Sequence, residues 1–178
     1  MSRTKRLSFA ALIAALCVLC LAGSLLLPRV TLSLAALAGL FPAAVVIVCG
    51  YGWAAGSAAV AALLALLLLP DKTAGVWFLC FFGHYPIWKA LIETYQTKLG
   101  KPLYGWVLKL LGFALCMTLM YVLFTKLFAA AIPAALTESA AGPVLLVLAL
   151  LAAFAAYDIA FSILIGWFRV KVLPKLKL

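Results

Sequence analysis

Apolar residues dominate the chain and occur in long runs that polar or helix-breaking residues separate. A helix that crosses a bilayer needs about twenty mostly apolar residues, each contributing 1.5 Å of length. Six segments reach or nearly reach this length, so the pattern predicts an all-α, polytopic membrane protein with six transmembrane helices. These predicted segments are 7–27, 31–49, 53–69, 73–92, 105–128 and 143–167.

Proline and glycine define most of the predicted boundaries. Pro28 ends the first segment, a turn at 50–52 ends the second, and the sequence Pro-Asp-Lys at 70–72 ends the third. Pro42 and Pro86 lie inside the second and fourth segments, where proline removes a helical hydrogen bond and is expected to kink the helix. The only long connection is 129–142, so we expect a single domain over residues 1–178.

The distribution of Lys and Arg predicts the orientation. Six crossings place both termini, the turn at 50–52 and the loop at 98–101 on one side, whereas the loops opposite contain only Arg29 and Lys72 as basic residues. Cytoplasmic loops carry the excess of basic residues, so we expect both termini to be cytoplasmic. The basic residues on this side are Arg3, Lys5, Arg6, Lys98, Lys101, Arg169, Lys171, Lys175 and Lys177.

Composition supports a lipid environment: 69% of residues are hydrophobic and 10% are charged. The net charge of +10 does not indicate a nucleic-acid partner, because the basic residues flank the apolar segments, where they contact lipid headgroups. The basic N-terminus followed by residues 7–27 resembles a signal peptide, but the length of the run predicts a first transmembrane helix. We expect a multi-pass protein of a bacterial inner membrane.

All five cysteines fall inside apolar stretches, which argues against a disulfide framework. Cys17 and Cys20 form a C-x-x-C pair that we interpret as small buried side chains. A thiol oxidoreductase that uses this pair is an alternative, to be tested in a cysteine-free variant. The sequence predicts neither a metal site nor a cofactor.

Ionisable residues inside a membrane are costly and point to function. His84 and Asp158 lie at a similar predicted depth, about 14 Å from the cytoplasmic edge at 1.5 Å per residue. Lys89 is placed to pair with Glu93 on its own helix or to reach Asp158. We expect a network of His84, Tyr85, Lys89 and Asp158, which is either a substrate or proton site or a contact that locks the fourth helix to the sixth.

Two further lysines, Lys109 and Lys126, lie within about a turn of a predicted boundary. Their long side chains are expected to extend toward the interface. An enzyme is not expected, because the chain has one histidine, four carboxylates and no recognisable hydrolase or phosphate-binding motif.

Small residues spaced by four mark helix faces that meet other helices in lipid. Either packing within the bundle or docking of a partner protein accounts for them. The residues are Ala10, Ala11, Ala14 and Ala15 in the first segment and Gly52 and Gly56 in the third.

The small-residue first helix, the six-helix plan and the glycine-rich sequence GYGWAAGSAAV at 50–60 resemble the substrate-binding S component of energy-coupling factor (ECF) vitamin transporters. The resemblance implies docking through the small-residue faces to a transmembrane coupling subunit that works with ABC-type ATPases. It also implies a small vitamin-like ligand, bound in the outer half near Trp77 and Glu138. The same plan resembles the MreD family of cell-shape membrane proteins, which implies a non-catalytic membrane scaffold instead.

Overall fold

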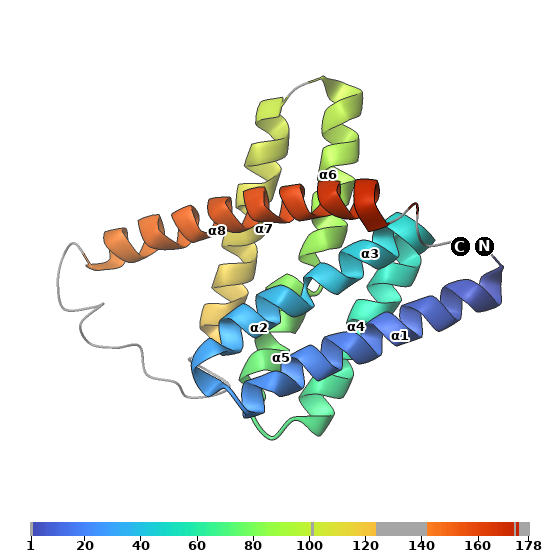
Figure 1. Cartoon of the computed structure of the whole chain (residues 1–178). Helices are drawn as coiled ribbons and strands as arrows, with labels where there is room; N and C mark the ends of the chain where they lie inside the picture. The colour runs from blue at the N-terminus through green and yellow to red at the C-terminus, as the bar shows by residue number, and fades with distance from the viewer. Residues whose placement is uncertain (1, 101, 124–141, 173, 175–178) are drawn as a thin grey trace. The chain divides into compact units, whose positions relative to one another are not determined.

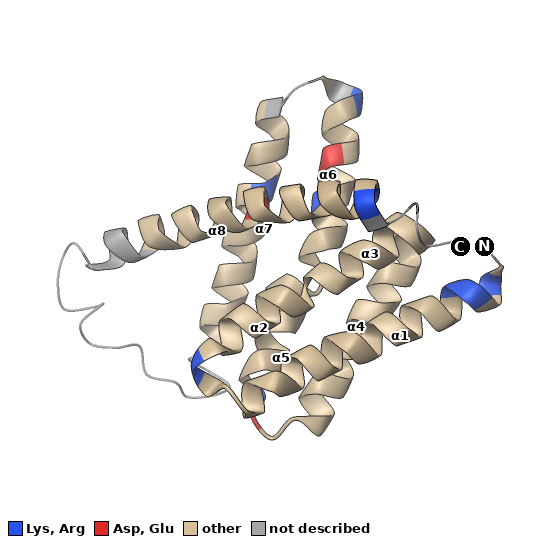
Figure 2. Cartoon of the chain, in the orientation of Figure 1, with Lys and Arg blue, Asp and Glu red and all other residues tan. Residues whose placement is uncertain are grey.

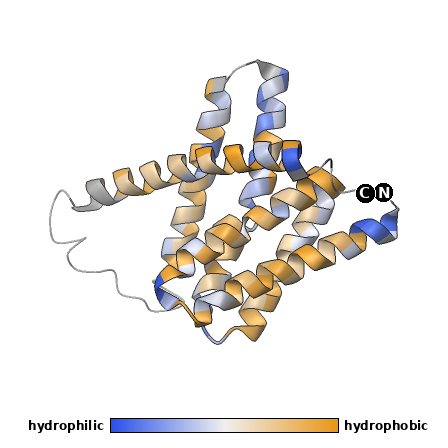
Figure 3. Cartoon of the chain, viewed as in Figure 1, coloured by the Kyte–Doolittle hydropathy of each residue, from blue (hydrophilic) through white to orange (hydrophobic). Residues whose placement is uncertain are grey.

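The computed structural model describes residues 2–100, 102–123, 142–172 and 174 (Figure 1). These residues form helices and no strands, which confirms the predicted all-α class for the described part of the chain. In that part, five helices are long and apolar enough to cross a membrane. Figure 3 shows hydrophobic residues over most of the helices and hydrophilic ones at the start of α1. The five candidate spans are Arg3–Leu25, Pro28–Cys49, Tyr51–Leu68, Leu103–Val122 and Val147–Lys171.

Backbone contacts divide the chain into two compact units, Met1–Met120 and Tyr121–Leu178. The first unit contains the helices up to α6 and most of α7. Its first elements are α1 (Arg3–Ala22), the 3₁₀ turns η1 (Gly23–Leu25) and η2 (Pro28–Val30), α2 (Thr31–Ala38), α3 (Leu40–Cys49) and α4 (Tyr51–Leu68). Basic residues lie at the start of α1 and in the turn before α2 (Figure 2).

Helices α1 and α4 pack against each other. The buried residues of α1 are Ala10, Ile13, Ala14, Cys17 and Leu21, and three of them, the two alanines and the cysteine, have small side chains. Side chains of this size let two helix backbones approach closely, which is the main source of helix association in lipid. The buried residues of α4 are Ala54, Ser57, Ala58, Ala61, Ala62 and Ala65.

The second predicted segment is one candidate span with a break at Gly39, between α2 and α3. Pro42 lies in the first turn of α3 and has no N–H with which to bond to the Ala38 carbonyl. The thiol of Cys17 lies 3.6 Å from that carbonyl oxygen and donates to it, while the thiol of Cys20 donates to the Leu34 carbonyl at 3.4 Å. Both cysteines of the C-x-x-C pair are therefore free thiols that bond α1 to the backbone of α2.

The turn predicted at 50–52 forms between α3 and α4. Gly50 has a φ of 95°, a backbone conformation that favours glycine, and α4 begins at the next residue. The third segment ends at Leu68, immediately before the Pro-Asp-Lys sequence. These boundaries confirm the predicted ones to within two residues.

The fourth predicted segment is a broken helix and is not among the five candidate spans. It consists of α5 (Thr73–Trp77), a π-helical turn η3 (Phe78–Phe82) and α6 (Tyr85–Leu99). The Gly83 N–H bonds to the Phe78 carbonyl at 2.7 Å, which closes the wide turn. A Cβ on Gly83 would lie 2.9 Å from that carbonyl oxygen, and Pro86 in the first turn of α6 cannot continue the helix from η3.

An antiparallel hairpin joins α6 to α7 (Pro102–Val122), as Figure 1 shows. Gly100, in the left-handed conformation with a φ of 63°, ends α6 and lets the chain reverse. Gly105 of α7 lies against the side chain of Gln96, in a space that a Cβ would fill. Gly100 thus allows the reversal, and Gly105 leaves room for the Gln96 side chain near the closed end of the hairpin.

Besides the last residues of α7, the second unit contains α8 (Gly142–Trp167) and a π-helical turn η6 (Phe168–Val172). Phe154, Asp158 and Phe161 are buried and share one face of α8, at spacings of four and three. The hydroxyl of Ser162 donates to the Asp158 carbonyl at 2.8 Å, a bond within the helix. Asp158 is thus the acidic residue of an otherwise aromatic face.

Candidate ligand pocket

A pocket of about 100 Å³ lies between α6 and α7 in the first unit. It begins beside the break before α6 and follows one face of each helix of the hairpin. Its lining residues are Phe81, His84, Tyr85, Trp88, Lys89, Ile92, Leu108, Lys109, Gly112, Phe113, Leu115 and Cys116. The lining is mainly aromatic and aliphatic with a few polar groups, which is the usual composition of a small-molecule site.

His84 closes one end of the pocket, at the break between η3 and α6. Its Nδ1 lies 3.0 Å from the Leu79 carbonyl oxygen, and because a carbonyl only accepts, Nδ1 carries the proton. In the neutral ring, Nε2 then accepts a hydrogen bond from the thiol of Cys116 on α7, at 3.4 Å. The π-helical turn and α7 therefore fix both the tautomer and the orientation of the ring.

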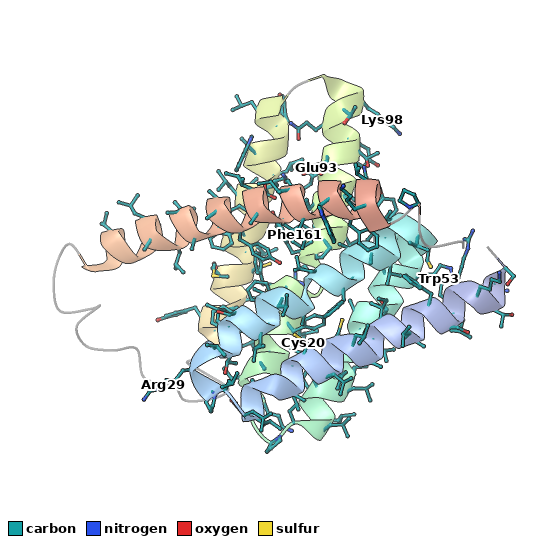
Figure 4. All side chains as sticks on the ribbon, viewed as in Figure 1. Cys20, Arg29, Trp53, Glu93, Lys98 and Phe161 are labelled. Carbon is teal, nitrogen blue, oxygen red and sulfur yellow. The ribbon has the colours of Figure 1, made fainter. Side chains whose placement is uncertain are left out.

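A cluster of three charges occupies the other end of the pocket. Nζ of Lys89 lies 2.9 Å and Nζ of Lys109 lies 3.0 Å from the same oxygen, Oε1 of Glu93. Lys89 and Lys109 are 1% and 8% exposed, whereas Glu93, labelled in Figure 4, is 44% exposed. The ion pair between Lys89 and Glu93 confirms the predicted pairing within one helix.

Lys109 corrects an expectation from the sequence. We predicted that its side chain extends to the interface, but it is buried in the hairpin and bonds to Glu93. Its Nζ also lies 5.5 Å from the centroid of the Trp106 ring, one turn away on α7. Glu93, on the facing helix of the hairpin, is close enough to bond to the Lys109 ammonium group. The side chain therefore does not need to extend to the membrane interface to find a partner.

Aromatic rings form the wall between the two polar ends. The Phe81 ring lies 5.0 Å from that of Tyr85 and 5.7 Å from that of Phe113, the latter edge to face, between ring centroids. Phe81, Tyr85 and Phe113 are all buried. Such ring contacts stabilise the packing of these three side chains against one another.

A second pocket, of about 180 Å³, lies between α4 and the broken helix. Its lining is almost entirely apolar and contains four alanines of α4. His84 lines both pockets. The imidazole is therefore shared between the two spaces.

The structure brings three of the predicted site residues together, since His84, Tyr85 and Lys89 line the same pocket. Asp158 belongs to the second unit, so its predicted pairing with Lys89 or His84 stays a prediction. Trp77 ends α5 and lines neither of the two pockets. Glu138 lies outside the described residues.

The small residues predicted for partner docking divide into two groups. Ala10 and Ala14 are buried in the interior face of α1. The other four, Ala11, Ala15, Gly52 and Gly56, are exposed on α1 and α4. Docking of a partner stays a prediction for this exposed group.

Sequence reasoning missed the contribution of α7 to the pocket. Gly112, Phe113 and Cys116 lie within an apolar run that has the composition of any transmembrane helix. One signal was present: Lys109, Gly112, Phe113 and Cys116 follow one another at spacings of three, one and three, which places them on one helical face.

Within the described residues, no group of three or more His, Cys, Asp or Glu side chains is placed to hold a metal ion. The chemistry of the pocket rests instead on two ammonium groups, one imidazole, one thiol and an aromatic wall. This arrangement is suited to binding a small molecule by charge and shape. No protein-family model, curated protein or solved structure matches the chain.

Proposed function

We propose that this chain is the substrate-binding membrane subunit of a transporter, similar in plan to an ECF S component, and that it binds rather than transforms a small vitamin-like molecule. The pocket between α6 and α7 supports this proposal, because polar groups converge at both of its ends and aromatic rings form its wall. Substrate sites of transporters commonly lie where a transmembrane helix is broken, as the helix is at His84. The proposal places the ligand there rather than near Trp77 and Glu138.

The proposal includes six crossings, both termini in the cytoplasm and a bacterial inner membrane. The broken helix supports the additional crossing, because α5 contacts α2 and α6 contacts α3, in the same chain order as this candidate span. The hydroxyl of Tyr51 also lies 3.2 Å from Oγ1 of Thr94, so α6 reaches the end of the bundle where the Gly50 turn lies. The segment from α5 to α6 thus follows a helix pair long enough to span.

Filling the pocket tests ligand binding. Gly112 lines the pocket and a Cβ there meets no heavy atom within 4 Å, so Gly112→Leu is expected to fill part of the pocket. Gly166→Leu is the matched control, since Gly166 lies in α8 in equally open surroundings and does not line the pocket. A panel of vitamin-like molecules is screened by thermal unfolding of the purified protein and both variants.

We expect at least one ligand to raise the unfolding temperature of the wild type and of Gly166→Leu but not of Gly112→Leu. At a concentration of 100 times Kd, a ligand stabilises the native state by about 2.7 kcal/mol. The absence of both a stabilising ligand and a co-purifying small molecule would overturn the proposal.

The partner protein is tested by affinity purification from native membranes. We expect a coupling subunit and ABC-type ATPases to co-purify with the wild type and to be lost from Ala11→Leu/Ala15→Leu, whose sites are exposed. The unfolding temperature of that variant should be unchanged, whereas Ala14→Leu at a buried site should lose about 1–3 kcal/mol of stability. Recovery of cell-shape proteins without ATPases would instead favour a scaffold of the MreD type.

A further inference from the structure

We propose that the pocket between α6 and α7 selects a planar organic monocarboxylate, with the carboxylate at Lys89 and Lys109 and the ring against the aromatic wall. This inference rests on the proposed ligand-binding function and adds the charge and shape of the ligand. It also assigns different roles to the two ends of the pocket: the lysine end binds the charge, and His84 limits the length.

The charge of the lining indicates that the ligand is an anion. Among the described residues that line the pocket, two bear ammonium groups and none bears a carboxylate. Glu93 bonds to both ammonium groups but is not part of the lining, and water reaches its side chain, which is 44% exposed. An anion inside the pocket would meet the ammonium groups in a medium of low dielectric constant, where the attraction between charges is stronger than in water. The lining therefore favours an anion over a neutral or cationic molecule.

The shape of the pocket indicates that the ligand has a single planar ring. Lys89 lies five positions after His84, the residue that precedes α6, which corresponds to about 7.5 Å along a helix axis. The pocket volume of about 100 Å³ is small, but Trp88 and Leu115 in its lining are 54% and 71% exposed, so a ring can extend toward them. Phe81, Tyr85 and Phe113 offer ring faces and edges to a planar group. A carboxylate attached to a single ring fits both the length and the wall.

Three probes of one shape test the charge: benzoate, benzamide and benzamidine carry a negative, a neutral and a positive group on the same ring. Their binding to the purified wild type is measured by isothermal titration calorimetry. We expect benzoate to bind at least tenfold more tightly than benzamide and benzamidine to bind more weakly still. Gly112→Leu should abolish benzoate binding, and Gly166→Leu should not change it.

Two substitutions shift the affinity in opposite directions. Lys109→Gln should weaken benzoate binding about tenfold with little effect on benzamide, and Lys109→Arg should retain most of the binding. Glu93→Gln removes a carboxylate that bonds to both ammonium groups and should strengthen benzoate binding about three- to tenfold, the increase being limited by the water around Glu93. A variant that merely folds poorly does not gain affinity.

Equal affinity for benzamide and benzoate, both lost in Gly112→Leu, would overturn the charge selectivity and leave the binding function standing. Binding of benzoate to Asp158→Asn but not to the wild type would also overturn the proposal, because the anion at the lysines would then be a carboxylate of the protein. Failure of all three probes, together with failure of the vitamin-like panel, would remove the binding function itself.

Discussion

At the residue scale, the close approach at Gly39 sets how the two broken helices meet. A Cβ at this position would lie 2.7 Å from the Phe82 carbonyl oxygen and 3.0 Å from the Phe82 Cβ. Pro86 has no N–H to offer the carbonyl four residues earlier, which is that of Phe82. The junction between α2 and α3 therefore lies directly against the end of η3. Only glycine, which has no Cβ, fits at this position.

We predict that Gly39→Ala destabilises the protein by about 1–3 kcal/mol, because backbone atoms must shift to admit the methyl group. Thermal unfolding in detergent measures the effect. Gly56→Ala is the control: it lies within α4, where a Cβ meets nothing within 4 Å, and should be neutral or stabilise the helix by up to about 1 kcal/mol. Equal effects of the two substitutions on stability would contradict this prediction, because the backbone at Phe82 would then shift at little cost.

Single residues also show where sequence reasoning succeeds and fails at the site. His84, Tyr85 and Lys89 stand out in the sequence because they are polar or ionisable residues in an apolar segment, and all three line the pocket. Gly112 and Cys116 carry no such signal. Lys109 was misjudged because its nearest partner, Glu93, lies 16 positions away and meets it only once the hairpin has formed.

At the scale of elements, the bond from Cys17 to Ala38 ties α1 to the break in the second span. Pro42 leaves the Ala38 carbonyl without an N–H from one turn ahead, and the Cys17 thiol donates to it. The Ala38 carbonyl therefore lacks a donor from Pro42 on α3 and receives one from Cys17 on α1.

We predict an interaction energy of about 0.5–1 kcal/mol between Cys17→Ala and Pro42→Ala in a double-mutant cycle. In the Pro42→Ala background the helix supplies its own N–H to Ala38, so the loss of the thiol should cost less than in the wild type. Chemical denaturation of the four proteins in detergent gives the coupling. Strictly additive effects would contradict the shared acceptor.

The helix boundaries that the sequence predicts well are those with a local chemical cause, such as the Gly50 turn and the Pro-Asp-Lys sequence after α4. The π-helical turn η3 was not predicted. Its sequence, FLCFF, is apolar throughout and lacks the alternation with polar residues that would reveal a change of helical period. The turn also lies against Gly39, a tertiary contact that no local pattern records.

At the scale of the whole molecule, the number of crossings determines on which side of the membrane two loops lie. If the segment from α5 to α6 crosses, the loop at 98–101 and the C-terminal end of α8 lie on the side of the N-terminus. If it does not cross, both lie on the opposite side. Positive charge favours the first arrangement, because Lys98, Arg169 and Lys171 then join the basic N-terminus in the cytoplasm.

We predict that a cysteine placed at Lys98 in a cysteine-free background is protected from a membrane-impermeant maleimide in intact cells and is labelled after the membrane is opened. A cysteine at Arg29, whose side chain projects from the turn before α2 in Figure 4, should be labelled in intact cells. Labelling at both positions in intact cells would mean that the segment from α5 to α6 does not cross.

The π-helical turn has a consequence for the orientation of α6. An α-helix advances about 100° about its axis per residue, and η3 contains one more residue per hydrogen-bonded turn than α-helix does. If the extra residue were taken up elsewhere in the segment, α6 would present a face turned by roughly that angle relative to α5. Lys89 would then turn away from Lys109, and the lysine end of the pocket would come apart. The position of this one wide turn therefore determines which face of α6 meets α7.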